Sequence, residues 1–257
     1  MNIIAIIPAR MASTRYPGKP MAKINGIPMI GHVYHRCKLS TALSDVYVAT
    51  CDEEIREYVE SIGGKAVMTA DTHERCTERT AEALQIIESE TGRQMDIVLM
   101  VQGDEPMLEP SMIEEVLRPL IDNPKIQVAN LSAPLKNQKE HEDPNEVKVV
   151  VDLTGNALYF SREPIPSRKK GANNVPMLKQ VCLIPFRRDF LLEFNSLAPT
   201  PLEVIESVDM MRVLEHGYAV KMIPTVCDTY SVDTPEDLKH VEELMKNKPL
   251  NYQIVMR

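Results

Sequence analysis

The stretch Asn2-Ile-Ile-Ala-Ile-Ile-Pro8, near the amino terminus, is continuously apolar after its first residue and ends in a proline. A run of this length without polar alternation is typical of a strand that is buried on both faces. Strands of that kind belong to parallel sheets covered by helices. The stretch therefore predicts a central strand of an α/β fold, and the proline marks the point where that strand gives way to a loop.

The segments that follow alternate between helical and strand-like patterns. Asp52 stands where a helix N-cap is expected, and Gly63 and Gly64 stand where the same helix should end. This alternation predicts a mostly parallel central sheet flanked by helices. We expect helices at 28–39, 52–62, 77–90 and 110–120, and strands at 46–50, 65–68 and 96–101.

The pattern changes after about residue 125, where strand-like segments follow one another with few helices between them. We expect strands at 127–134, 147–152, 157–161 and 180–185, and a surface loop at 164–176. Helices are expected at 187–195, 201–216 and 234–246, with a strand at 219–223. The sequence thus predicts a single domain over 1–257, with about 125–200 forming an antiparallel insertion or extension of the sheet.

Composition excludes several classes of protein. The formal net charge of −8 disfavours nucleic-acid binding, which usually requires a basic domain. No apolar run is long enough to span a bilayer, and the amino terminus lacks the basic region of a secretory signal, so we expect a cytoplasmic protein without membrane contacts. The five cysteines form no metal-ligand pattern, which disfavours a zinc site.

The loop Pro8-Ala-Arg-Met-Ala-Ser-Thr-Arg-Tyr-Pro-Gly-Lys-Pro20 follows the first strand. Ligands of open α/β sheets bind beyond the carboxyl ends of the strands, which is where this loop lies. It carries cations, hydroxyl donors and small residues, and these groups suit a triphosphate. The alternative is a solvated basic loop. The groups in question are Arg10, Arg15 and Lys19, with Ser13, Thr14 and Gly18.

Two acidic motifs are candidates for a magnesium site. In Val101-Gln-Gly-Asp104-Glu-Pro-Met107, Asp104 follows a predicted buried strand, and carboxylates are the ligands that Mg²⁺ prefers. An ordinary turn is the alternative there. In Ser231-Val-Asp233-Thr-Pro-Glu-Asp237, Asp233 precedes a predicted helix, so Asp233 or Thr234 is also a candidate N-cap.

These motifs and several others occur in the same order as in one known family. The blocks are residues 7–20, 25–30, 48–50, 77–79, 101–107, 144–151, 157–162 and 232–238. Together they resemble the CMP-KDO synthetases, which are 3-deoxy-manno-octulosonate (KDO) cytidylyltransferases. The resemblance covers nearly the whole chain, and several ungapped blocks are more specific than one short motif.

The resemblance implies a glycosyltransferase-A-like, Rossmann-like α/β fold and a homodimer, with the insertion contributing to the substrate site and the dimer. It implies Mg²⁺-dependent transfer of CMP from CTP to a KDO-like acidic sugar in lipopolysaccharide biosynthesis, with release of pyrophosphate. The roles that it implies for single residues are as follows. The nucleotide would contact Ala9, Arg10, Ser13, Thr14, Arg15, Lys19, Thr77, Glu78 and Arg79; catalysis would use Arg10, Lys19 and Asp104; Mg²⁺ would be held by Asp104 and Asp233; and the acceptor would contact Gln102, Arg162, Gln180 and Asp209.

Three segments depart from the family pattern. Arg75-Cys76 replaces a Ser-Gly pair, Gln180-Val-Cys-Leu-Ile184 replaces a run that carries His and Tyr, and Asp209-Met210 replaces Glu-Gln. Losing groups that bind hydroxyls alters substrate choice. We therefore predict an acceptor related to KDO but distinct from it, such as another 2-keto-3-deoxy sugar acid or a phosphonate. The alternatives are drift in a KDO enzyme, use of another nucleoside triphosphate, and a nucleotide-sugar binding protein without catalysis.

Overall fold

The chain divides into two compact units, one made of residues 1–114 and 229–257 and the other of residues 115–228. The computed structural model describes residues 1–12, 16–171 and 174–247, and the structural statements below apply to these ranges. The expected insertion at about 125–200 falls inside the second unit. The single-domain organisation stays a prediction.

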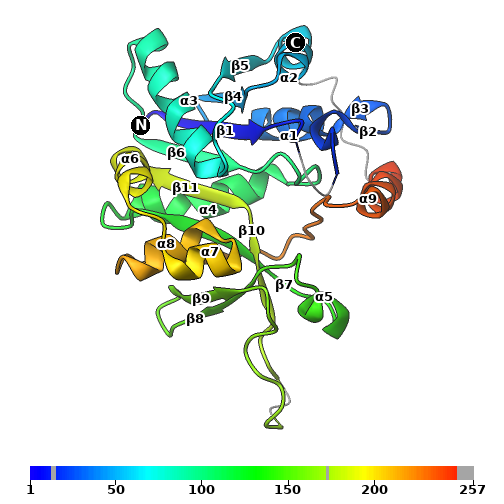
Figure 1. The fold of residues 1–257 in the computed structure, drawn as a ribbon, viewed down its shortest axis with the longest axis vertical. Helices are drawn as coiled ribbons and strands as arrows, with labels where there is room; N and C mark the ends of the chain where they lie inside the picture. The colour runs from blue at the N-terminus through cyan, green and yellow to red at the C-terminus, as the bar shows by residue number, and fades with distance from the viewer. Residues whose placement is uncertain (13–15, 172–173, 248–257) are drawn as a thin grey trace. The chain divides into compact units, whose positions relative to one another are not determined.

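A parallel sheet lies at the centre of the first unit, in blue and cyan in Figure 1. Its central strand, β1, is the apolar stretch at the amino terminus, and every residue of that strand is buried. β1 pairs in parallel with β4 on one side and with β6 on the other, and β4 pairs in parallel with β5. This arrangement confirms the predicted parallel sheet.

Helices α1, α2 and α3 pack against this sheet, and each lies where the hydrophobic periodicity predicts a helix. No helix among the described residues is long and apolar enough to cross a bilayer. The elements of the first unit are β1 (Ile3–Ala9), η1 (Lys19–Met21), β2 (Lys23–Ile24), β3 (Ile27–Pro28), α1 (Met29–Lys38), β4 (Asp45–Thr50), α2 (Glu53–Ser61), β5 (Lys65–Met68), α3 (Cys76–Thr91), β6 (Ile97–Val101) and α9 (Pro235–Asn247). Helix α4 (Pro110–Asp122) contains the boundary between the units.

The second unit has its own five-stranded sheet, in the order β12-β7-β10-β8-β9. The pairs β7–β10, β10–β8 and β8–β9 are antiparallel, which agrees with the predicted antiparallel extension, whereas β12 pairs with β7 in parallel. Its elements are β7 (Ala129–Pro134), α5 (Gln138–Glu142), β8 (Lys148–Val151), β9 (Ala157–Ser161), β10 (Leu178–Val181), β11 (Leu183–Arg187), α6 (Arg188–Ser196), α7 (Pro201–Glu206), α8 (Asp209–Glu215) and β12 (Lys221–Pro224).

Two predicted elements are wrong because each is divided in the structure. The strand expected at 180–185 is two strands, β10 and β11, separated at Cys182. The helix expected at 201–216 is two helices, because Ser207 has a left-handed backbone with φ of 52°. The short helix α5 has no counterpart among the expected elements.

In the first unit, a cluster of buried apolar side chains packs helix α9 against segments that come much earlier in the sequence. Val241 and Met245 of α9 pack in one cluster with Met29 and Met107. Val232, which is fully buried, belongs to the same cluster. The packing fixes the segment just before α9 beside the segment just after β6, although the two are far apart in the sequence.

A buried ion pair joins α7 and α8 in the second unit. Arg212 donates from Nε and Nη2 to the two carboxylate oxygens of Glu203, at 2.7 and 2.6 Å. The two side chains are only 4% and 1% exposed, and the guanidinium lies 4.8 Å from the centre of the Phe194 ring. Such a pair has high desolvation costs, so removing one partner leaves the other charge buried and uncompensated.

We expect Arg212→Met to lower the free energy of unfolding by about 3–5 kcal/mol, because the Glu203 carboxylate loses its partner in the core. The double variant Arg212→Met/Glu203→Leu should regain most of that loss. Arg188→Met is the control, because its partner Asp189 is exposed, and it should cost less than about 1 kcal/mol. Urea unfolding monitored by circular dichroism measures the free energy of unfolding of all three variants. An equal decrease for Arg212→Met and Arg188→Met would contradict the account.

Candidate functional site

The Lys19 ammonium group lies between two carboxylates in the first unit. Its Nζ donates to Oδ2 of Asp104 at 2.9 Å and to Oδ1 of Asp233 at 3.2 Å. It also donates to the carbonyl oxygen of Val232 at 2.8 Å. The side chains of Lys19, Asp104 and Asp233 are only 13%, 21% and 14% exposed. Residues that the sequence places in three separate motifs thus meet at one point.

The protonation state of Lys19 follows from two opposing effects. Burial disfavours the charged ammonium, but the attraction and hydrogen bonds of Asp104 and Asp233 outweigh it, so the pKa of Lys19 is raised above its ordinary value. Lys19 is therefore a cation at neutral pH. Two half-buried carboxylates gathered at one point require such a positive partner.

Asp104 is placed by the end of β6. The carboxyl ends of β1 and β6 lie at the same edge because the two strands are parallel. Gly103 leaves room there for Ile30, because a Cβ atom on residue 103 would lie 3.3 Å from Ile30 Cδ1. Val232 N donates to Asp104 O at 2.9 Å, which joins the two acidic segments through the backbone. Gln102 also follows β6 and is half-buried.

Thr234 and Asp237 form the cap of α9. Thr234 Oγ1 accepts from Asp237 N at 3.2 Å, and the Asp237 carboxylate accepts from the backbone N–H groups of Asp233 and Thr234. Of the two N-cap candidates, Thr234 is therefore the one used. The Asp233 carboxylate accepts from Lys19 Nζ.

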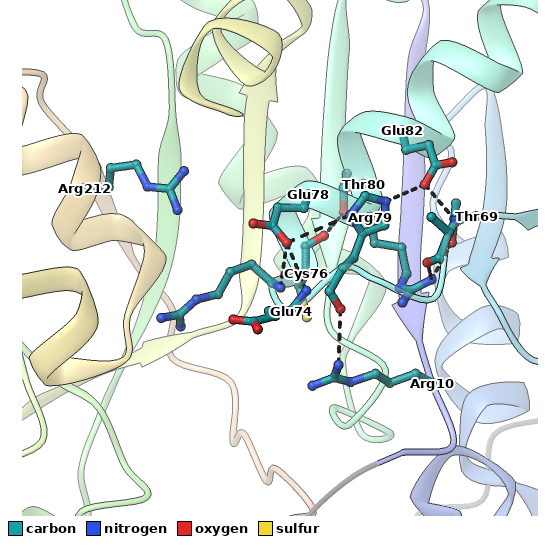
Figure 2. Close-up of polar contacts among 12 residues, drawn as sticks. Arg10, Thr69, Glu74, Cys76, Glu78, Arg79, Thr80, Glu82 and Arg212 are labelled. Atoms are coloured by element: carbon teal, nitrogen blue, oxygen red, sulfur yellow. Dashed lines mark hydrogen bonds and ion pairs between the residues drawn. The ribbon is translucent and has the colours of Figure 1, made fainter. Parts of the chain in front are cut away.

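The β1–η1 loop, residues 10–18, begins directly after Ala9 at the end of β1. The Arg10 side chain is exposed and donates from Nη1 to the carbonyl oxygen of His73 at 3.2 Å, as Figure 2 shows. Gly18 N donates to Met11 O at 3.0 Å and so closes the loop. The predicted nucleotide contacts of Ser13, Thr14 and Arg15 lie outside the described residues.

Glu78 and Arg79 shape the segment that precedes α3. The Glu78 carboxylate accepts from the backbone N–H groups of Glu74 and Arg75 at 3.0 and 3.1 Å, and Arg79 donates to the Thr69 hydroxyl and to the Ala70 carbonyl (Figure 2). Arg79 is 3% exposed and Thr77 is fully buried. Both charged side chains thus hold the backbone of residues 69–75, and their predicted nucleotide contacts stay predictions.

The remaining predicted acceptor contacts lie in the second unit. Arg162 donates to the carbonyl oxygens of Glu206, Pro144 and Ser207, which fixes it to the corner between α7 and α8. Gln180 Nε2 donates to Oδ1 of the buried Asn130 at 2.6 Å. Asp209 is the first residue of α8 and is half-buried. Arg162 and Gln180 therefore have structural contacts, and none of the three is shown to contact an acceptor.

Comparisons with known proteins all match this chain to cytidylyltransferases. A family model described as cytidylyltransferase matches residues 4–223. The 3-deoxy-manno-octulosonate cytidylyltransferase of Geobacter metallireducens is 44% identical over 253 residues, covering 95% of this chain and 97% of that one. The enzyme of the same name from Acaryochloris marina is 41% identical over 93% of this chain and 95% of its own length.

A solved structure agrees with these relatives. The structure of CMP:2-keto-3-deoxy-manno-octonic acid synthetase complexed with CTP is 37% identical, covers 96% of this chain and 100% of its own, and has a TM-score of 0.86. The chain belongs to the CMP-KDO synthetase family. It is accordingly a nucleotidyltransferase, and the alternative of a binding protein without catalysis is set aside.

Two residues of the second unit that differ from the CMP-KDO synthetase pattern are buried in the structure. Ile184 and Met210, which replace Tyr and Gln of the family pattern, are 3% and 0% exposed. Both are core side chains here, so the apolar residues suit their surroundings. Gln180 keeps a polar group, and Asn130 orients it.

Sequence reasoning missed two contributions to the site. The Val232 carbonyl oxygen is one, and no side-chain motif could reveal it. The other is Asp52, which was expected to cap α2 but has no capping hydrogen bond from its side chain. Its Oδ2 accepts from Met11 N at 2.8 Å. The strand register could have indicated this contact, because Ala9 and Thr50 are partners in the parallel sheet.

Proposed function

We propose that this protein transfers CMP from CTP to the anomeric hydroxyl of a KDO-like acidic sugar and releases pyrophosphate. The cluster of Lys19, Asp104 and Asp233 at the carboxyl edge of the sheet is the observation that carries the proposal. The cluster adjoins the β1–η1 loop, whose sequence suits phosphate binding. Relatives named for this activity, one of them solved with CTP, support the choice of nucleotide and acceptor class.

The proposed reaction is an in-line displacement at phosphorus. The oxygen of the acceptor hydroxyl forms a bond to the α-phosphorus of CTP, the hydroxyl proton passes to solvent, and the bond from that phosphorus to the bridging oxygen breaks, so that pyrophosphate leaves. Catalysis of such a transfer depends on positioning and on stabilising the negative charge of the transition state. In this proposal, Lys19 and Arg10 supply that charge, and Asp104 and Asp233 orient Lys19 until the triphosphate arrives.

The residues around Lys19 also fit a magnesium ion. No three His, Cys, Asp or Glu side chains gather into a metal site within the described ranges. Asp104 and Asp233 nevertheless both reach one cationic atom, and Mg²⁺ commonly takes one or two carboxylates together with waters and substrate phosphates. Bound there, Mg²⁺ would lower the pKa of the acceptor hydroxyl and neutralise charge on pyrophosphate.

For the acceptor we propose an acid related to KDO but distinct from it. The support is the change of the family's His to Gln180 and of its Glu to Asp209, which are the polar groups that remain in those two segments. A site that hydrogen-bonds substrate hydroxyls discriminates strongly against analogues. KDO itself is the alternative, because the family relatives carry its name.

We further propose a homodimer that acts in the cytoplasm, in lipopolysaccharide biosynthesis. The second unit exposes large apolar side chains on α7 and β9: Val204, Ile205 and Leu158 are 63%, 73% and 61% exposed. A hydrogen bond from Tyr159 to Glu206 links these two elements. Exposed apolar groups on adjoining elements are typical of contact surfaces between subunits.

A pyrophosphate-release assay with CTP, Mg²⁺ and a panel of sugar acids and phosphonates tests the function. We expect turnover with a KDO-like acid, slower turnover with KDO, and no comparable rate with the other three nucleoside triphosphates. Asp104→Asn should lower kcat by about 100-fold or more, because Mg²⁺ would lose a charged ligand and Lys19 would lose a carboxylate that orients it. Asp122→Asn, at an exposed position, is the control.

Turnover with KDO at the highest rate of the panel would contradict the altered acceptor while leaving cytidylyl transfer intact. No CTP-dependent pyrophosphate release with any acid would contradict the proposed function itself. An Asp104→Asn variant as active as the Asp122→Asn control would contradict the assignment of Asp104.

Replacing Lys19 should expose the competition between its ammonium group and a metal ion. In nucleotide-free protein, we expect Lys19→Met to bind Mn²⁺ about 10-fold or more tightly than the wild type, because the two carboxylates lose their internal cation. Electron paramagnetic resonance of free Mn²⁺ measures this, with Lys38→Met as the control. Equal or weaker Mn²⁺ binding by Lys19→Met would count against a shared cation site.

A charge on α7 should separate the proposed subunits. We expect Ile205→Asp to be monomeric and the wild type dimeric by light scattering after gel filtration, since burying an unpaired carboxylate in an apolar contact is costly. Val226→Asp is the control, because Val226 is 97% exposed and lies outside α7 and β9. A monomeric wild type would refute the homodimer, and a dimeric Ile205→Asp would place the contact elsewhere.

A further inference from the structure

We infer that Asp52 is a positioning residue that fixes the start of the β1–η1 loop for nucleotide binding, an inference that rests on the proposed function. The carboxylate of Asp52 accepts a hydrogen bond from the backbone N–H of Met11 at 2.8 Å. This bond joins two segments 41 residues apart in the sequence. Met11 itself directly follows Arg10, one of the two proposed phosphate-binding cations among the described residues.

The carboxylate of Asp52 has no role in capping the helix that it precedes. The first hydrogen bond of α2 from this residue uses its carbonyl oxygen, which accepts from Arg56 N at 3.2 Å. The side chain makes no capping bond, although carboxylates at this position usually do so. Asp52 thus occupies a favourable N-cap position and uses its side chain on another segment instead.

The backbone around Asp52 is held so that the carboxylate faces the loop. Asp52 N donates to the hydroxyl of Thr50 at 3.1 Å. Thr50 is fully buried and is the last residue of β4, where it pairs with Ala9 of β1. Two parallel strands therefore end side by side, and two residues beyond the aligned pair, Asp52 meets Met11.

Fixing Met11 also fixes the other end of the loop. The carbonyl oxygen of Met11 accepts from Gly18 N at 3.0 Å, and Gly18 immediately precedes Lys19. The carbonyl oxygen of Met11 thus receives the hydrogen bond from the far end of the loop, and the N–H of the same residue is tied to Asp52. The Asp52 carboxylate therefore sets the positions from which both Arg10 and Lys19 extend.

Charge alone does not explain an acidic residue at this place. A carboxylate near a triphosphate repels it, so the favourable contribution comes from the hydrogen bonds that Asp52 accepts. Its Oδ2 accepts from Met11 N at 2.8 Å and, more weakly, from the neighbouring Cys51 Sγ at 3.7 Å, and only the first of these reaches the loop. An asparagine retains a side-chain oxygen that accepts this bond, whereas an alanine does not. The hydrogen-bond acceptor and the negative charge can therefore be separated by substitution.

Two measurements on Asp52→Ala and Asp52→Asn test the inference. In nucleotide-free protein, amide hydrogen exchange of Met11 by nuclear magnetic resonance should be about 10-fold faster in Asp52→Ala than in the wild type, and near the wild-type rate in Asp52→Asn. With CTP, the KM of Asp52→Ala should rise about 10-fold with a smaller change in kcat, and Asp52→Asn should restore it.

Asp45→Ala is the matched control, because Asp45 starts the same strand β4 and pairs with Lys65 rather than with the loop. Its Met11 exchange and its KM for CTP should match the wild type. Thermal unfolding of all variants detects a general loss of stability, and the exchange of Met11 is then compared with that of Val48 in the core of β4.

Unchanged Met11 exchange in Asp52→Ala, or an Asp52→Asn variant that behaves like Asp52→Ala, would overturn the inference. If the wild type releases no pyrophosphate from CTP, the proposed function fails. The exchange measurement still decides whether Asp52 holds the loop, so the two failures are distinguishable.

Discussion

The contact of the Lys19 ammonium with Asp104 and Asp233 is the interaction on which the candidate site depends. Lys19 is separated from these carboxylates by 85 and 214 residues, so the contact joins the first loop, the end of β6 and the segment before α9. The apolar cluster of Met29, Met107 and Val232 supports the same junction from within the core. Within the cluster the single ammonium of Lys19 partly compensates the two carboxylates.

Both ends of the β1–η1 loop are held by acidic side chains, each in a different way. Asp52 binds a backbone N–H group, which carries no net charge, and its contact can persist when a triphosphate arrives. Asp104 and Asp233 bind an ammonium group, and in the proposed mechanism a triphosphate competes with them for it. We therefore expect the loop to stay fixed through its backbone, while Lys19, which follows it, exchanges carboxylate partners for phosphates.

The sequence was sufficient for the features that depend on local patterns, and insufficient where a distant partner decides. The apolar run of β1 predicted a buried parallel strand, and Lys19, Asp104 and Asp233 were identified from their places beside strands and a helix. Local patterns did not predict the break at Ser207, where the preceding Glu206 carboxylate is bound by Tyr159 and by the backbone of Arg162. Asp52 is the N-cap residue of α2, as expected, but local patterns did not show that its carboxylate binds a partner in another segment.

The central claim is that Lys19 occupies, between two carboxylates, a place that a metal ion takes when the triphosphate binds. Crystals grown with Mn²⁺ and a non-hydrolysable CTP analogue test this most directly, through the anomalous signal of manganese. The account predicts an anomalous peak in contact with Asp104 and Asp233, with Lys19 Nζ moved onto a phosphate oxygen. A bound nucleotide with Lys19 still paired to both carboxylates, and no manganese beside them, would contradict it.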